Sequence, residues 1–370
     1  MTGDLVQFPL HSETLPRSEA RAAAARVLDI ARNERADRER ELRLEDPEQL
    51  LAIAELLRSR LEATPTEVLA DSEFFFGFLE KPIRPIGRFD EREYYLGEFG
   101  LLAGIACRLL AFREKALLWL DRAESHFVLA HNSSAHVARA NYQKLAVRLE
   151  QRELAEVAEL AERWFRVFVS LELPQDALKC RFLQAHALKE TGRHNEAILE
   201  FEQIKSAAER LRNDNLAAIA AENLFQIHAM RGDVEAAVAE AEFAGPIFRR
   251  LDNRVNLAKL QVGVGYLYHS QNRLKESISA FREAQKQFAE IGMHADVAAN
   301  HLVLADLLLD ANQPAQAEWE IRAALPVIDE LTLVPEGIAA LSLLRDSVRR
   351  RQIDRQALRS LNGYFEELKS

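Results

Sequence analysis

Residues 259–296 read KLQVGVGYLYHSQNRLKESISAFREAQKQFAEIGMHAD and decide the fold of this chain. Apolar side chains at Leu260, Val264 and Leu267 recur at the spacing of one helix face, and a second such series follows. Between the two series lies Asn272, and Asn tolerates the left-handed conformation that often ends a helix. The stretch therefore predicts a helical hairpin.

The hairpin repeats along the chain with a period of 40 residues. Helix-breaking turns fall at Gly192, Gly232, Asn272 and Asn312, and the register extends with decay from about residue 97 to residue 370. Because one such unit cannot bury its own apolar face, this periodicity predicts an all-α solenoid of about seven stacked hairpins. Small or apolar residues stand 5 and 12 positions after each turn: Ala197, Ala237, Ser277 and Ala317, then Ile204, Ala244, Ala284 and Ala324.

Glycines inside the expected helices predict close contacts between helices. Gly263 and Gly265 lie in the first helix of the quoted hairpin, where a missing side chain lets a neighbouring helix approach. Gly97, Gly100 and Gly104 are embedded among leucines and isoleucines, so we expect helix packing there and not a phosphate-binding loop.

The residues before about 97 do not share the register. We expect a flexible tail over 1–15, an N-terminal helical capping region over 16–96 and the solenoid over 97–370. Helices are predicted over 17–43 and from the start signals at Pro47, Pro65 and Asp90. The aromatic run 74–78 is interpreted as a plug over the open end of the solenoid or, alternatively, as a docking patch.

Composition bounds the function. The chain has 370 residues, a formal net charge of -10 and only two cysteines, Cys107 and Cys180, which we expect to be reduced and buried. The negative charge gives no global support for nucleic-acid binding. No leader-like start and no apolar run long enough for a membrane span are found, so a cytoplasmic protein is expected.

No residue pattern predicts chemistry. His126, His131 and His136 are spaced by five, which turns each away from the last around one helix, and no paired His or Cys motif has metal-ligand spacing. We therefore expect no metal, no cofactor and no catalytic residue. The basic stretch over 345–359 is interpreted either as the solvated face of the last unit, partly paired with Asp346 and Asp354, or as a surface for an acidic partner or nucleic acid.

Two sets of residues carry a resemblance to a known family: Asn223-Leu224-Phe225 with Gly232, Ala237 and Ala244, and Gly265, Tyr268 and Asn272 with Ser277, Phe281 and Ala284. Both resemble the tetratricopeptide repeat, and units of this length are similar to those of kinesin light chains and Rap-type peptide receptors. The resemblance implies that the first helix of each hairpin lines a concave groove. The lining residues that it assigns are Arg139, Tyr142, Gln143, Lys179, Phe182, His186, Glu222, Asn223, Gln226, Lys259, Tyr266, His269 and Asp306.

The resemblance also implies a role for one of these residues. Asn223 stands where those groups use Asn to hold a peptide backbone, and Arg139, Lys179 and Lys259 would favour an acidic segment. The leading hypothesis is a non-catalytic scaffold or adaptor that binds a protein segment. The alternative is a ligand- or peptide-responsive regulator of signalling or transcription that acts through its N-terminal helices.

Overall fold

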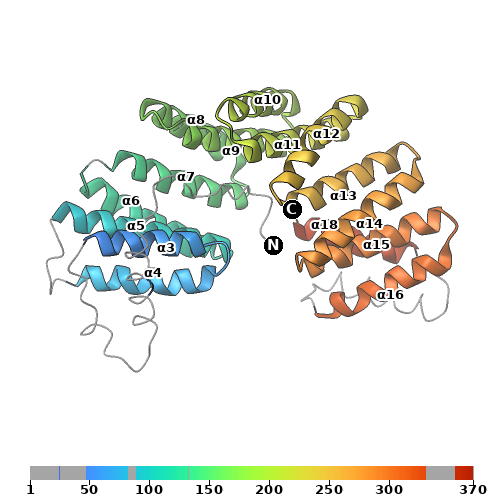
Figure 1. The fold of residues 1–370 in the computed structure, drawn as a ribbon, viewed down its shortest axis with the longest axis horizontal. Helices are drawn as coiled ribbons and strands as arrows, with labels where there is room; N and C mark the ends of the chain where they lie inside the picture. The colour runs from blue at the N-terminus through green and yellow to red at the C-terminus, as the bar shows by residue number, and fades with distance from the viewer. Residues whose placement is uncertain (1–24, 26–46, 82–88, 132, 331–354, 370) are drawn as a thin grey trace. The chain divides into compact units, whose positions relative to one another are not determined.

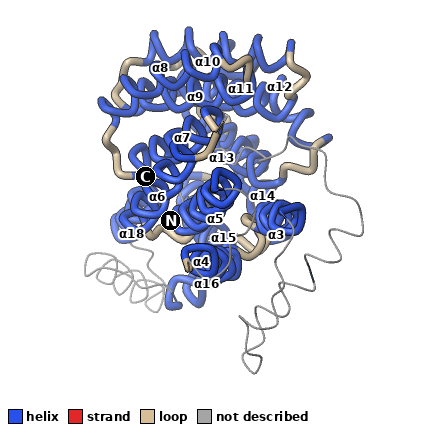
Figure 2. The backbone as a smooth tube through the Cα atoms, turned by 90° about the vertical axis from the view of Figure 1, so that its left-hand side faces the viewer, coloured by secondary structure: helices blue, strands red, loops and turns tan. Residues whose placement is uncertain are grey.

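The computed structural model describes residues 25, 47–81, 89–131, 133–330 and 355–369, and over these residues all regular structure is helical, with no strand (Figure 2). The helix predicted over 17–43 lies outside the described residues, apart from Ala25. The predicted all-α fold is thus confirmed. Figure 1 shows antiparallel helices following one another along the chain.

The chain divides into two compact units, residues 2–200 and 201–370, with the boundary inside helix α10 (His194–Arg210). The first unit holds α3 (Pro47–Arg60), α4 (Pro65–Glu80), α5 (Phe89–Leu109), α6 (Arg113–Leu129), α7 (Ser134–Glu150), α8 (Leu154–Ser170) and α9 (Pro174–Glu190). The second unit holds α11 (Asp214–Arg231), α12 (Val234–Arg250), α13 (Arg254–Ser270), α14 (Leu274–Glu290), α15 (His294–Asp310), α16 (Pro314–Glu330) and α18 (Arg355–Lys369).

The turns recur twice as often as the sequence register indicates. A residue with φ between 51° and 77° ends the helix at every twentieth position from Arg152 to Asn312, alternating between the two ends of the hairpins. At each turn the next amide donates back across the last helical turn, as Arg273 N does to Tyr268 O at 2.9 Å. This is the hydrogen-bond pattern of a Schellman cap. The 40-residue unit is therefore two helices of nearly equal length joined by identical caps.

One prediction follows from these caps. Gly232→Ala should destabilise the protein by about 1 kcal/mol, because a side chain in the left-handed region is strained while no neighbour lies within 4 Å of the added Cβ. Arg212→Gly, at the preceding cap with φ of 54°, should stabilise it by about 0.5–1 kcal/mol for the converse reason. Denaturant midpoints followed by circular dichroism measure both changes. A midpoint for Arg212→Gly at or below that of the wild type would contradict this account of the caps.

The small positions of the register lie at the crossings of paired helices. Each residue of the two sets named above, from Ala197 to Ala324, is fully buried. A Cβ on Gly265 would lie 2.7 Å from the Phe281 ring of the paired helix, and one on Gly104 would lie 2.7 Å from Leu120. The glycines therefore permit close helix contact, as predicted.

The amino-terminal helices start where the sequence signals place them: α3 begins at Pro47 and α4 at Pro65. The predicted start of the solenoid at residue 97 falls inside α5, which already begins at Phe89. The aromatic run is part of α4, where Phe75 and Phe76 are buried; Phe75 stacks on Phe99, with ring centroids 5.3 Å apart. These two rings are thus core residues of the first unit.

Candidate partner-binding surface

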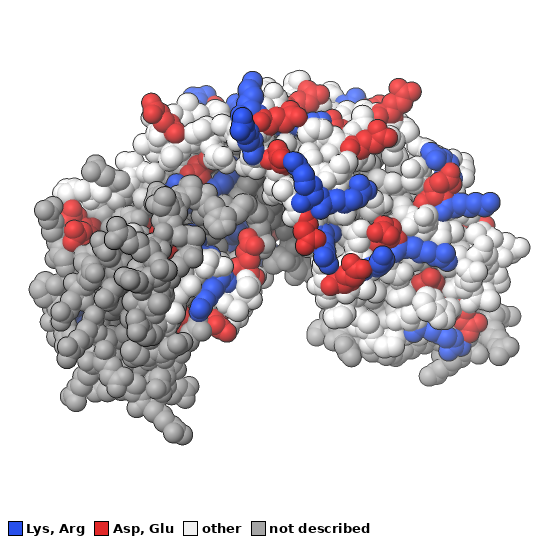
Figure 3. Space-filling model, viewed as in Figure 1, with Lys and Arg blue, Asp and Glu red and all other residues white. Residues whose placement is uncertain are grey.

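The residues assigned to a groove lie on the first helix of successive hairpins, and they are divided between the two units. Helices α7 and α9 carry those of the first unit, and α11, α13 and α15 carry those of the second. We describe each unit by itself. On the face shown in Figure 3, basic and acidic side chains lie next to one another over the described surface.

In the first unit, the basic side chains are paired with an acid. Arg139 Nε donates to Asp176 Oδ2 at 3.1 Å, and Lys179 Nζ donates to Asp176 Oδ1 at 2.8 Å. Burial works to raise the pKa of Asp176, but the charges of Lys179 and Arg139 outweigh it and hold that pKa below its ordinary value. Both cations therefore pair with the Asp176 carboxylate of this chain, and they do not by themselves indicate an acidic partner.

Several assigned residues belong to the core and not to a surface. Phe182 is fully buried, and Gln143 is buried with 6% exposure. Tyr142 is half-buried among apolar side chains, and burial raises its pKa well above the ordinary value. Here the prediction of a partner-contacting Phe182 and Gln143 is wrong, because the register fixes the helix and the side of it but not how closely the neighbouring helix packs.

The same correction applies to α11 in the second unit. Asn223 is only 4% exposed, and its Nδ2 donates to Ile219 O of its own helix at 3.0 Å. Glu222 is also buried and accepts from Gln226 one turn later. In this structure Asn223 is therefore a buried residue of α11, and its burial keeps it from the role of holding a peptide backbone that the resemblance implied.

Helices α13 and α15 present the exposed part of the predicted set. Tyr266 is 40% exposed and the His269 side chain 47%, one helical turn apart on α13. On α15 lies Asp306, and Asp310 follows one turn later with its Oδ2 3.7 Å from His269 Nε2. We refer to Tyr266, His269, Asp306 and Asp310 as the α13/α15 face.

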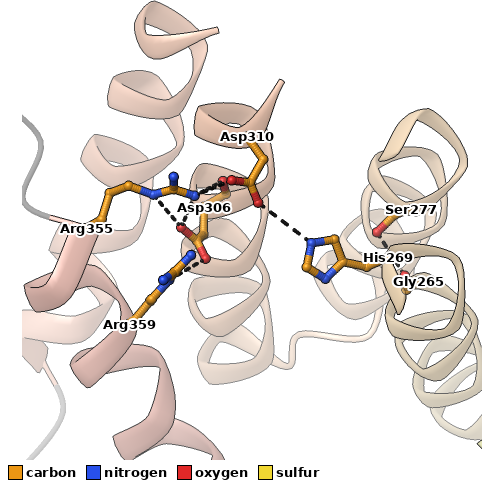
Figure 4. A network of polar contacts seen from close by, with 7 residues as sticks. All are labelled: Gly265, His269, Ser277, Asp306, Asp310, Arg355 and Arg359. Atoms are coloured by element: carbon orange, nitrogen blue, oxygen red, sulfur yellow. Dashed lines mark hydrogen bonds and ion pairs between the residues drawn. The ribbon is translucent and has the colours of Figure 1, made fainter. Parts of the chain in front are cut away.

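A helix from the carboxy-terminal end of the described chain, α18, binds the α15 part of this face, at Asp306 and Asp310 (Figure 4). Arg355 of α18 donates to Asp306 Oδ1 at 2.9 Å and to Asp310 Oδ1 at 2.5 Å, and Arg359 Nε donates to Asp306 Oδ2 at 3.0 Å. The hydrogen bond from Arg355 is the main cause that lowers the pKa of Asp310. The sequence shows the spacing of the two arginines, but it contains no signal for acids about 50 residues earlier. The other predicted partners, Asp346 and Asp354, lie outside the described residues.

The described residues offer little for catalysis. None of them form a group of three or more His, Cys, Asp or Glu side chains able to hold a metal ion. His126 Nδ1 lies 2.6 Å from Glu93 Oε2 and pairs with it. Both cysteines are free and buried, and burial raises the pKa of Cys107 to about 11, so this thiol is protonated and a poor nucleophile at neutral pH. Over the same residues, no helix combines the length and hydrophobicity needed to cross a membrane.

Paired antiparallel helices joined by regular caps define a helical-repeat protein. Residues 258–288 match the family model described as tetratricopeptide repeat, so the predicted assignment to that repeat family is confirmed for the α13–α14 hairpin. No protein with a curated description matches the chain.

Solved structures with the same fold extend this likeness over most of the chain. A Rap protein complexed with competence and sporulation factor has a TM-score of 0.56 and 15% identity, over 95% of this chain and 99% of its own. The Rap conjugation gene regulator of plasmid pLS20, in complex with the Phr* peptide, has a TM-score of 0.57 and 14% identity, over 96% and 97%. Aspartyl phosphate phosphatase F from Bacillus subtilis has 0.53 and 10%, over 88% and 98%. At these identities the likeness establishes the fold alone.

Proposed function

We propose that this chain is a non-catalytic binding protein for a segment of another protein or for a peptide, contacted by the first helices of its repeats. The observation that carries the proposal is the exposed Tyr266 and His269 on α13, beside the acids of α15. Aromatic side chains with a polar end are enriched in the centres of protein interfaces, and a half-exposed Tyr next to ionisable groups suits such a contact.

The candidate role as a peptide-responsive regulator is supported by a second observation. Two of the structures with this fold hold competence and sporulation factor or the Phr* peptide. By analogy, a peptide bound to the first helices would shift this chain between two arrangements of its repeats. A scaffold would instead bind its partner without such a shift. Small-angle X-ray scattering separates the two roles: a changed radius of gyration on binding favours the regulator.

The binding role itself is tested by affinity purification from a lysate of the source organism, with quantitative mass spectrometry. Tyr266→Ala together with His269→Ala should remove most of the captured partner while the circular dichroism spectrum stays helical, because truncating the few central contacts of an interface weakens it by about tenfold or more. Trp319→Ala is the control, since Trp319 is an aromatic residue even more exposed than Tyr266, and it lies on α16, the second helix of its hairpin. Equal capture by the double variant and the control would contradict the proposal.

A further inference from the structure

The same register position differs in its exposure to solvent between two successive repeats. Tyr266 of α13 and Asp306 of α15 stand 40 residues apart and so occupy equivalent places on their helices. Tyr266 is 40% exposed, whereas the Asp306 side chain is 24% exposed and accepts hydrogen bonds from both arginines of α18. The surface that is open on α13 is therefore covered on α15 by a helix of the chain itself.

The contact between α18 and α15 has the composition of an exchangeable interface. Its described apolar part consists of Ala357, Leu358 and Leu361, all buried against the cluster that α15 and α16 form. Its polar part is the pair of arginines one helical turn apart, and the Arg355 and Arg359 side chains stay 39% and 61% exposed. Ion pairs this accessible to water stabilise an interface only weakly, so α18 is held mainly by these three apolar side chains, which a competing segment with the same pattern can replace.

The chemistry that α15 requires of its occupant is specific. Asp306 and Asp310 lie one turn apart on α15 and accept from Arg355 together, while the second oxygen of Asp306 accepts from Arg359. A planar guanidinium can serve two carboxylates at once, which an ammonium group does less well. A competing segment therefore needs two arginines spaced by four on a helix, with small or apolar side chains at the positions of Ala357, Leu358 and Leu361.

We propose that the α15 surface around Asp306 and Asp310 is a binding site for an arginine-bearing helical segment of a partner, and that α18 occupies this site in the free chain as an internal competitor. This inference rests on the proposed binding function and names the partner's chemistry for one part of the α13/α15 face. Since α18 is tethered, the apparent affinity for the partner is lowered by the fraction of chains in which the site is closed. Binding of the partner releases α18.

The test uses the full chain and, as probe, a fluorescein-labelled synthetic peptide of residues 355–369, followed by fluorescence anisotropy. In the full chain, Arg355→Glu with Arg359→Glu places two carboxylates opposite Asp306 and Asp310 and should loosen α18. We expect this variant to bind the peptide about tenfold more tightly than the wild type does, because the site is no longer occupied in most molecules. Adding Asp306→Asn and Asp310→Asn to the same variant should weaken peptide binding about tenfold, because the arginines of the peptide then meet no opposite charge.

The matched control is Arg322→Glu, which reverses an exposed arginine that pairs within its own helix with Glu318. It should bind the peptide as the wild type does. If the charge-reversed chain loses helicity, the milder variant Arg355→Gln with Arg359→Gln takes its place. It should also bind the peptide more tightly than the wild type does. The inference is overturned if the loosened, folded chain binds the peptide no better than the wild type, or if binding is indifferent to Asp306 and Asp310.

The outcome is separable from that of the proposed function. If Tyr266→Ala with His269→Ala removes a captured partner but the peptide never binds in trans, the binding function stands and the role of α18 falls. If the peptide exchanges as expected but no partner depends on Tyr266 and His269, α18 is a mobile cap and the proposed binding function falls.

Discussion

Arg108→Leu is expected to destabilise the first unit by about 3 kcal/mol at pH 7, since removing one partner of a buried ion pair leaves the other charge uncompensated. Arg108 on α5 donates from Nη1 to Glu150 Oε1 on α7 at 3.0 Å, and both side chains are 12% exposed. The pair joins the C-terminal ends of α5 and α7, the first helices of two successive hairpins. Leu keeps much of the apolar volume of the arginine stem, so the loss should come from the charge.

The pH dependence of this loss identifies its cause. Burial raises the pKa of Glu150 above its ordinary value, and Arg108 only partly offsets that effect. A carboxyl with a raised pKa in the folded state stabilises the fold most below its unfolded pKa, and that stability is lost as pH rises through the folded pKa. Without Arg108 the pKa of Glu150 is raised further. The destabilisation caused by Arg108→Leu should therefore shrink to about 1 kcal/mol at pH 4.

Urea unfolding at pH 4 and pH 7 measures the effect. Arg108→Leu with Glu150→Gln is the matched control, because it removes the remaining charge and should show nearly the same loss at both pH values. A loss for Arg108→Leu that does not change with pH would mean that packing, and not the unpaired carboxylate, is responsible.

The sequence predicts the turns of the fold where the turn residue is of a type that readily adopts positive φ. Gly192, Gly232, Asn272 and Asn312 mark their caps because Gly and Asn tolerate positive φ. Among the alternate caps, only Asp252 and Gly292 use residue types suited to positive φ, while Glu172 and Arg212 adopt the same conformation with residues that rarely do so. The 20-residue period was therefore hidden, although the 40-residue period was plain.

The candidate site was predictable in its helices but not in its exposure. The register placed Tyr266 and His269 on an accessible side of α13, yet it gave Phe182 and Asn223 the same status although both are buried. Exposure depends on the size of the facing side chain and on how closely the next helix approaches, which a period does not encode. Pairing over long sequence distances, such as that of Arg355 with Asp306, depends on tertiary packing in the same way.

Gly265→Ala should destabilise the second unit by about 2 kcal/mol, although it adds only one methyl group. The added Cβ would lie 2.7 Å from two ring atoms of Phe281, which is fully buried between the paired helices, so either the ring or α14 must move. Ser277 Oγ also donates to Gly265 O at 2.8 Å across the same crossing (Figure 4), and a shift of α14 would break that hydrogen bond.

Gly77→Ala is the matched control: Gly77 lies inside α4 with no atom within 4 Å of the added Cβ, so the better helix propensity of Ala should stabilise the protein by about 0.5–1 kcal/mol. Opposite shifts of the denaturant midpoint for the same substitution would show that contact, and not propensity, sets the need for glycine at the repeat crossing. Partial recovery in Gly265→Ala with Phe281→Leu would assign the contact to that ring, whereas stability equal to or above the wild type for Gly265→Ala alone would contradict the packing described for α13 and α14.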